Sequence, residues 1–335
     1  MWWRRRSAQQ APEAPPTSLA PAQADALLRR TEWTVLRRLD GWLQGDHRSR
    51  QRGHGLDLAD LRAYQPSDDV RHIDWNVTAR QGTPHVRVFN EDRDMVVWLL
   101  LDRSPSQAFG SGAQRKHELM RDLALTLARW MGRHGNRVGA VVYEAEGVAP
   151  RVLPPRAGRD QLLRLLAELE RPTAAPSGQG TRLATLLQRA DALMRGRCAV
   201  ALVSDFISEP GWERPLGQLG QRHDLLALRL VDPLERQWPD IGLVTLTDPE
   251  TGDSVQVDTH DPGFRARFAQ LAHARELAVH QALAQAGADS MDLVTDSDWV
   301  ASLARLARMR RARATGRWRP AEAAPRVLRA AGGVA

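Results

Sequence analysis

Cysteine is almost absent from this chain of 335 residues: Cys198 is the only one, so no disulfide can form within the chain. Long apolar runs are also absent. The longest, residues 95–101, falls far short of the roughly 20 residues that a membrane helix needs. Residues 1–6 carry charge, but no apolar segment follows them as it would in a signal peptide. These absences predict a cytoplasmic protein without a transmembrane segment.

The short motifs of several enzyme classes are lacking as well. The chain has no Walker A sequence, no Gly-x-Gly-x-x-Gly and no His-Glu-x-x-His. Lysine is represented by Lys116 alone, which leaves little to stabilise a transferring phosphoryl group. We therefore expect that the protein is not an enzyme and has no small-molecule substrate.

Basic residues are concentrated at the two ends of the chain, which has a net charge of +7 and a pI near 10.8. Residues 305–335 hold nine arginines and one glutamate, for +8, and residues 1–20 contribute +2. Removing both from the total leaves −3 for residues 21–304, so the folded part is mildly acidic. Nucleic-acid binding through the Arg-rich tail stays open, although Trp318 is its only aromatic residue.

From residue 94 onward, apolar runs alternate with segments of helical periodicity. We expect strands at 95–101, 137–143, 151–153, 198–204, 225–231 and 291–294, and helices at 114–134, 160–169, 181–194, 211–222, 262–286 and 297–309. Residues 243–247 and 254–257 flank Asp-Pro-Glu-Thr-Gly-Asp and predict a hairpin. Such alternation predicts an α/β fold with a doubly wound, mostly parallel sheet.

The remainder of the chain divides by composition. Residues 1–20 are rich in Pro, Ala and Gln, and residues 25–43 show helical spacing of apolar residues. Residues 46–92 are densely charged, with a strand expected near Val86 and Val88. The predicted organisation is a disordered lead at 1–20, an N-terminal helix and small mixed subdomain at 21–92, the α/β domain at 93–310 and an Arg-rich tail at 311–335.

Oxygen-bearing side chains follow two of the predicted strands. Asp102, Ser104 and Ser106 form a D-x-S-x-S string directly after the strand at 95–101, and Asp205 follows the strand at 198–204. Thr181 begins a predicted helix, after a Ser-Gly-Gln-Gly loop. Two of these residues have an ordinary alternative role: Thr181 could cap a helix, and Asp205 could be a cap or turn carboxylate. Together they predict a Mg²⁺ site, since hard cations prefer such oxygens.

These five residues resemble the metal-ion-dependent adhesion site of von Willebrand factor A domains. The resemblance implies a Rossmann-type fold in which the three hydroxyls contact Mg²⁺ directly, the two aspartates act largely through water and a partner carboxylate completes the octahedron. Residues 52–75, with Thr78-Ala-Arg80 and 86–91, resemble the Domain of Unknown Function fifty-eight family, whose members often accompany MoxR-type AAA+ ATPases. Where that family usually has Gly-Asp after a proline, this chain has Ser67-Asp68, and it lacks the membrane helices of many relatives.

Six charged residues of that signature have two interpretations. Interleaved charges of opposite sign usually pair with one another and would hold the small subdomain together. Alternatively, they shape a partner-docking surface beside the metal. The residues are Arg62, Asp68, Asp69, Arg71, Asp74 and Arg80.

The expected function is a metal-ion-dependent protein-binding module that uses Mg²⁺, with Mn²⁺ as a substitute. The family resemblance implies an adaptor or co-chaperone-like partner of a MoxR-type AAA+ ATPase, or of its client protein. The alternatives are a phosphohydrolase with Asp102 as nucleophile and nucleic-acid binding through the tail. Alanine in place of Asp102 or Asp205 is expected to abolish capture of the partner with little effect on thermal unfolding.

Overall fold

The computed structural model describes most of the chain from residue 52 onward: residues 52–53, 57–65, 69–90, 95–112, 114–133, 135–173, 178–314 and 327–329. The predicted disordered lead and the helix expected at 25–43 lie outside these residues, as does most of the Arg-rich tail.

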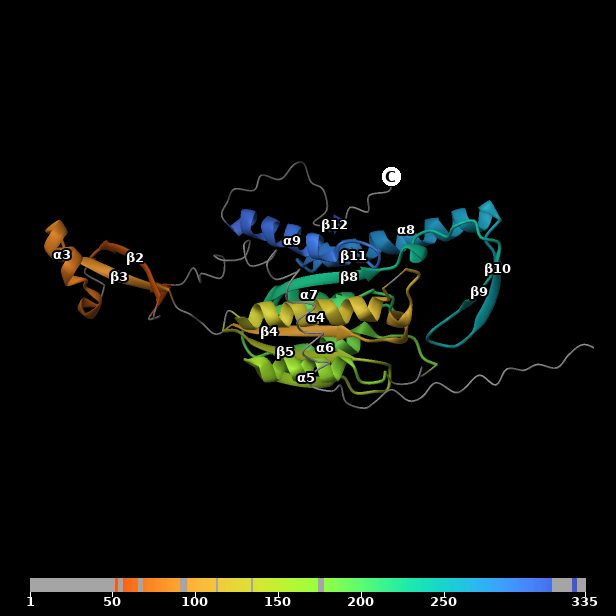
Figure 1. Ribbon diagram of the computed structural model, residues 1–335, viewed down its shortest axis with the longest axis horizontal. Helices are drawn as coiled ribbons and strands as arrows, with labels where there is room; N and C mark the ends of the chain where they lie inside the picture. The colour runs from red at the N-terminus through yellow and green to blue at the C-terminus, as the bar shows by residue number, and fades with distance from the viewer. Residues whose placement is uncertain are drawn as a thin grey trace, which may run out of the picture.

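Seven strands form the main sheet in the order β12-β11-β8-β7-β4-β5-β6 (Figure 1). All neighbouring pairs are parallel except β5 and β6, which are antiparallel. The prediction of an α/β fold with a mostly parallel sheet is confirmed. The strands are β4 (Val96–Asp102), β5 (Arg137–Tyr143), β6 (Arg151–Arg156), β7 (Ala199–Ser204), β8 (Asp224–Val231), β11 (Asp289–Val294) and β12 (Val327–Arg329).

Helices cover both faces of this sheet. Leu99 of β4 belongs to the core cluster formed with α4, α5 and α9, whereas its neighbour Leu100 belongs to the cluster formed with α6, α7 and α8. Side chains of a strand alternate between faces, so a strand covered on both sides is apolar throughout. The helices are α4 (Lys116–Arg133), α5 (Arg159–Leu169), α6 (Leu183–Leu193), α7 (Glu213–Arg222), α8 (Pro262–Gln285) and α9 (Trp299–Ala314). Within the described residues, none is both long and apolar enough to cross a membrane.

The predicted hairpin is present as β9 (Leu243–Thr247) and β10 (Ser254–Asp258), which pair with each other and form a separate two-stranded sheet. In Figure 1 the hairpin arcs away from α8 and curves back toward the end of the main sheet. The predicted tail contains more structure than expected: α9 continues to Ala314, and β12 pairs in parallel with β11.

The N-terminal part of the described chain forms a small unit of its own. Its sheet has the order β1-β3-β2, with β1 (Arg52–Gly53), β2 (Asp57–Ala63) and β3 (His85–Asn90), and α3 (Trp75–Gln81) lies between β2 and β3 in the chain. Asp69 and Asp74 cap the short helices that follow them: Asp69 accepts from the N–H of Arg71, and Asp74 accepts from those of Asn76 and Val77. Such caps stabilise a helix by about 1 kcal/mol each.

Close packing between α7 and the end of α8 depends on a glycine. A Cβ added at Gly220 would lie 1.9 Å from the carbonyl oxygen of Ala286, whereas one at Gly217, on the same helix, would meet nothing within 4 Å. We expect Gly220→Ala to lower the free energy of unfolding by roughly 2–3 kcal/mol. Gly217→Ala should raise it by up to about 1 kcal/mol through helix propensity. Urea unfolding of both variants checks this, and equal effects would contradict the packing.

Candidate metal centre

The order in which the chain adds strands to the sheet reverses at β4. From β4 the chain moves to β5 on one side, and it later returns to β7 on the other side of β4. Ligands of open α/β sheets collect at the carboxyl ends of the strands beside such a switch point. Asp102 is the last residue of β4, and Asp205 directly follows β7. Both carboxylates are therefore at the place where the fold favours a site.

The D-x-S-x-S loop is compact and buried. The Asp102 carboxylate accepts from the backbone N–H of Ser104 at 3.1 Å. It also accepts from the hydroxyl of Ser204, the last residue of the neighbouring strand β7, at 2.6 Å. The hydroxyl oxygens of Ser104 and Ser106 lie 3.0 Å apart. Two adjacent ligands of an octahedral Mg²⁺ ion are about 2.9 Å apart, because Mg–O distances are about 2.0–2.1 Å. The two hydroxyls therefore have the spacing of neighbouring ligands.

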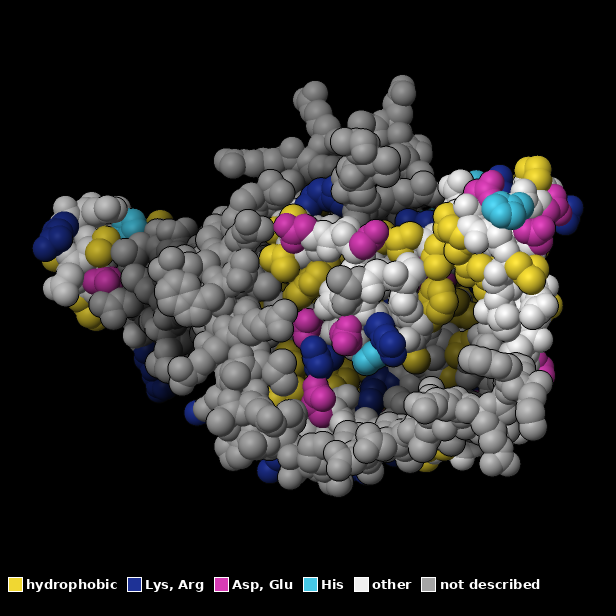
Figure 2. All heavy atoms as spheres, turned by 45° about the vertical axis from the view of Figure 1, so that its right-hand side comes forward, with side chains coloured by type: hydrophobic (Ala, Val, Ile, Leu, Met, Phe, Trp, Pro, Cys, Tyr) yellow, Lys and Arg dark blue, Asp and Glu magenta, His cyan; other side chains and the backbone are white. Residues whose placement is uncertain are grey.

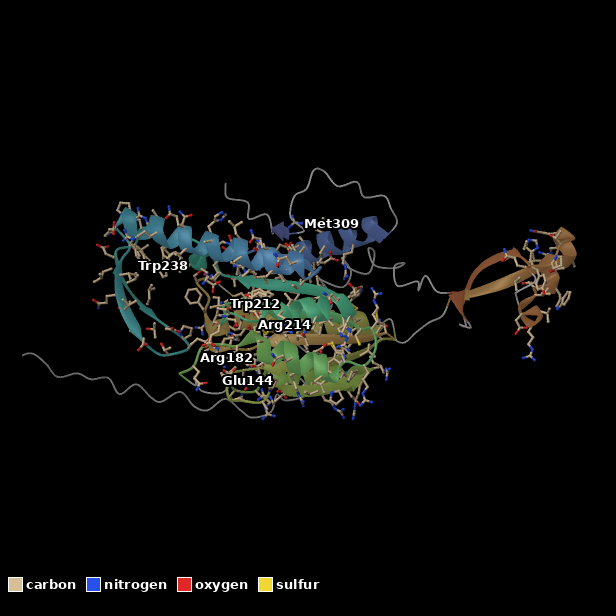
Figure 3. All side chains as sticks on the ribbon, turned by 180° about the vertical axis from the view of Figure 1, so that it is seen from behind. Glu144, Arg182, Trp212, Arg214, Trp238 and Met309 are labelled. Atoms are coloured by element: carbon tan, nitrogen blue, oxygen red, sulfur yellow. The ribbon has the colours of Figure 1, made fainter. Side chains whose placement is uncertain are left out.

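Thr181 reaches the same region from the loop before α6. The carbonyl of Thr181 accepts from the N–H of Glu209 at 2.8 Å and from the Ser208 hydroxyl at 3.0 Å, which ties this loop to the segment after β7. Arg182, labelled in Figure 3, pairs with Glu209 across the two segments. The N-cap residue of α6 is Arg182, so Thr181 does not cap that helix. Its hydroxyl instead donates to the carboxylate of Glu250 at 2.6 Å.

Asp205 is held by a buried ion pair that the sequence did not indicate. One carboxylate oxygen accepts from the ammonium of Lys116 at 2.6 Å, and the other accepts from the N–H of Ile207 at 2.9 Å. Lys116 also pairs with Glu235, and its side chain is completely buried. Burial alone would lower the pKa of Lys116, but the charges of Asp205 and Glu235 outweigh it and hold that pKa above its usual value. Asp205→Ala is therefore expected to destabilise the fold, contrary to the sequence-based expectation.

Negative charge accumulates at this end of the sheet. Burial, and then the charge of Asp205, raise the pKa of Asp102 to about 7, against the hydrogen bonds from Ser204 and Ser104. Burial also raises the pKa of Glu250, and the charge of Asp205 adds to the effect. A divalent cation placed among these groups would relieve their repulsion. The electrostatics therefore favour cation binding.

The predicted donors fit a hard cation. Hydrogen bonds link Asp102 to Ser104, Ser104 to Ser106 and Thr181 to Glu250. The N–H of Ser106 lies close enough to Glu250 to lower its pKa. Asp205 acts electrostatically on both Asp102 and Glu250. Within the described residues, no group of three or more His, Cys, Asp or Glu is arranged to hold a metal ion. A metal bound here would therefore depend on the hydroxyl oxygens, as the D-x-S-x-S pattern predicts.

The described members of the six charged signature residues lie in the small N-terminal unit. Asp69 and Asp74 act as helix caps there, which supports the structural interpretation for those two. Arg71 and Arg80 are exposed. Arg62 lies on β2 and its side chain is not described, and Asp68 lies outside the described residues.

Four residues of the site were missed by the sequence interpretation: Lys116, Ser204, Glu235 and Glu250. Lys116 stands out as the only lysine of the chain, but the sequence does not indicate which residues it pairs with. Ser204 ends a predicted strand beside Asp205, so its position at the strand edge was also available. Glu235 and Glu250 reach the site from segments distant in sequence, and no local pattern marks them.

The raised pKa of Asp102 predicts how stability depends on pH in chelator-treated protein. A carboxyl group whose pKa rises on folding, here from 3.8 to about 7, stabilises the fold below its unfolded pKa. That contribution is lost as the pH rises through about 7. Asp102→Asn has no such proton, so its stability relative to wild type should increase by up to about 4 kcal/mol between about pH 4 and pH 8. Urea unfolding across this range measures the difference, and a constant difference would refute the assignment.

The fold and this strand-end cluster define an α/β protein with a candidate cation site at its switch point. The family model described as "Protein of unknown function DUF58" matches residues 60–278. The chain belongs to this family. Uncharacterized protein Rv1480 of Mycobacterium tuberculosis is 37% identical over 286 residues, which cover 85% of this chain and 89% of that protein. Uncharacterized protein MAV169 of Mycobacterium avium is 36% identical over 159 residues, covering 48% of this chain and 94% of that protein.

Solved structures also resemble part of the chain. The conserved hypothetical protein BatB from Bacteroides thetaiotaomicron aligns with a TM-score of 0.41 and 14% identity, covering 63% of this chain and 96% of that one. An aerotolerance-related membrane protein from Bacteroides fragilis aligns with a TM-score of 0.42 and 15% identity, covering 64% and 97%.

Proposed function

We propose that this chain is a metal-ion-dependent protein-binding module with a von Willebrand factor A-like fold. Ser104, Ser106 and Thr181 contact Mg²⁺ directly, and Asp102 and Asp205 act largely through bound water. A carboxylate from the partner completes the coordination. The observation that carries the proposal is the pair of buried hydroxyls of Ser104 and Ser106, 3.0 Å apart at the switch point, in a loop that Asp102 holds through the N–H of Ser104.

The partner proposed is a MoxR-type AAA+ ATPase or a client that it remodels, on the basis of the family resemblance. A partner that supplies one carboxylate to Mg²⁺ would make a directional contact that a chelator dissolves. Mn²⁺ is expected to replace Mg²⁺, and the interaction is expected to take place in the cytoplasm.

The local chemistry favours binding over phosphoryl transfer at Asp102. Both carboxylate oxygens of Asp102 already accept hydrogen bonds, from Ser104 and Ser204, and the side chain is completely buried. Lys116 is held between Asp205 and Glu235, so its charge is already compensated. A nucleophilic aspartate needs an accessible oxygen and an uncompensated cation for the phosphoryl group.

Biolayer interferometry with the full chain and a purified MoxR-type ATPase from the same genome tests the proposal. We expect binding in Mg²⁺ that is lost in EDTA and reduced at least tenfold by Ser106→Ala, since one metal ligand is removed. Ser297→Ala is the matched control, because the Ser297 hydroxyl bonds only to the Val294 carbonyl in the described contacts. Equal binding with and without EDTA, and by the Ser106 variant, would overturn the proposal.

A further inference from the structure

The β9–β10 hairpin makes little use of the protein core. Leu243 and Val255, one on each strand, are 69% and 58% exposed. A two-stranded hairpin without a covered face is marginally stable in water. The base of this hairpin is nevertheless fixed, because the buried hydroxyl of Thr259 bonds to the Gly242 carbonyl and to the N–H of Ile241. The hairpin is therefore an arm attached at its base, whose outer end needs a separate contact.

The turn at the outer end orients one side chain inward. The Asp248 carboxylate accepts from the N–H of Glu250 at 2.8 Å, and the Asp248 carbonyl accepts from the N–H of Gly252 at the same distance. Gly252 adopts φ 80°, a conformation that closes the turn. Residues 248, 249 and 251–253 are exposed, whereas Glu250 is half-buried. The turn thus presents the Glu250 carboxylate to the body of the protein.

That carboxylate contacts two residues of the candidate metal centre. It accepts from the Thr181 hydroxyl at 2.6 Å, and the backbone N–H of Ser106 lies close enough to lower its pKa. The same carboxylate is within electrostatic range of Asp205. Figure 2 turns the side of the molecule that carries the hairpin toward the reader. A glutamate of this chain therefore reaches the candidate metal centre.

We propose that Glu250 is an internal ligand of the metal centre, occupying the position that a partner's carboxylate takes in the bound complex. This inference rests on the proposed function and adds its regulation. The hairpin is closed while Glu250 binds, and a partner's acidic side chain must displace it from the same groups. The partner is thereby expected to present a glutamate or aspartate on a projecting turn, as this hairpin does.

Charge explains why the closed state depends on the cation. Glu250 lies within electrostatic range of Asp205, and the chain's one lysine is already shared between Asp205 and Glu235. Without a divalent ion, a third carboxylate adds to the repulsion among the others. With the ion present, Glu250 becomes a ligand and the arm is held. Cation binding and hairpin closure are therefore coupled, and each strengthens the other.

Water relaxation by bound Mn²⁺ tests the inference without any partner. We compare wild type, Glu250→Ala, Glu250→Gln and Asp253→Ala; the last removes an exposed carboxylate from the same turn and is the control. Glu250→Ala and Glu250→Gln should bind Mn²⁺ roughly tenfold more weakly than wild type, because a charged ligand is lost. Their bound Mn²⁺ should carry one additional exchangeable water. Adding acetate should displace that water in Glu250→Ala and leave wild type unchanged.

The outcomes separate this inference from the proposed function. If wild type binds no Mn²⁺, the metal centre itself is refuted. If wild type binds Mn²⁺ but Glu250→Ala has the same affinity and the same number of bound waters, the centre stands and the internal ligand is refuted. A change of equal size in Asp253→Ala would also refute it, because the effect would then come from general charge at the turn.

Discussion

Replacing Lys116 with methionine is expected to lower the free energy of unfolding by about 3–5 kcal/mol. The substitution keeps the length of the side chain but leaves Asp205 and Glu235 buried without their common cation. Lys116 is the only lysine of the chain and its side chain is fully buried, so no other lysine can neutralise the two carboxylates. Chemical unfolding in chelator measures the loss.

The matched control for this prediction is Arg115→Met, on the preceding exposed residue, which should change stability by less than about 0.5 kcal/mol. Two further results are expected of Lys116→Met. Adding Glu235→Gln should restore part of the stability, since one buried charge is removed. Millimolar Mg²⁺ should stabilise the variant by mass action, because the ion binds the folded state. Wild-type stability in Lys116→Met would show that the ion pair has no structural role.

Replacing Asp102 with asparagine is expected to weaken Mg²⁺ binding by roughly 10–100-fold, the usual effect of removing a group that orients metal ligands. Asp102 holds Ser104 through its backbone N–H, and the Ser104 hydroxyl in turn bonds to that of Ser106. Titration calorimetry of the full chain with MgCl₂ measures the affinity. Asp160→Asn, which removes an exposed carboxylate on α5, should leave it unchanged. Equal affinity in all three proteins would place any metal elsewhere.

The strands and helices of the sheet were predictable because burial on both faces leaves an unambiguous pattern. The run from Val96 to Leu101 is apolar throughout since its alternate side chains enter two different cores. The helices between the strands carry apolar residues at helical spacing, because each covers only one face of the sheet. These are local consequences of packing, so the sequence shows them directly.

The first half of the site was predictable for the same reason. Asp102, Ser104 and Ser106 are neighbours in the chain, and Asp205 follows a strand whose position in the sheet could be inferred. The alternative of Thr181 as a helix cap was wrong, because α6 begins two residues later and the threonine hydroxyl binds Glu250. The sequence could not choose between these two uses of a threonine, since both require it at the start of a helix.

The remaining residues of the site depend on distant contacts. The turn containing Glu250 was predicted, but its contact with Thr181, 69 residues earlier in the chain, was not. The ion pair of Lys116 joins a helix, a strand end and a short 3-10 helix that no single pattern connects. Side-chain partners far apart in the chain leave no periodic signal, which is why these contacts emerged only from the structure.

The most direct measurement is anomalous diffraction from crystals of the full chain grown with Mn²⁺. The account predicts one strong peak at the carboxyl end of β4, about 2.1 Å from the hydroxyl oxygens of Ser104 and Ser106. It should also lie within reach of the Thr181 hydroxyl, with Asp102 and Asp205 behind it. A peak coordinated by other residues, or none at saturating Mn²⁺, would contradict the proposal that these five side chains form a metal centre.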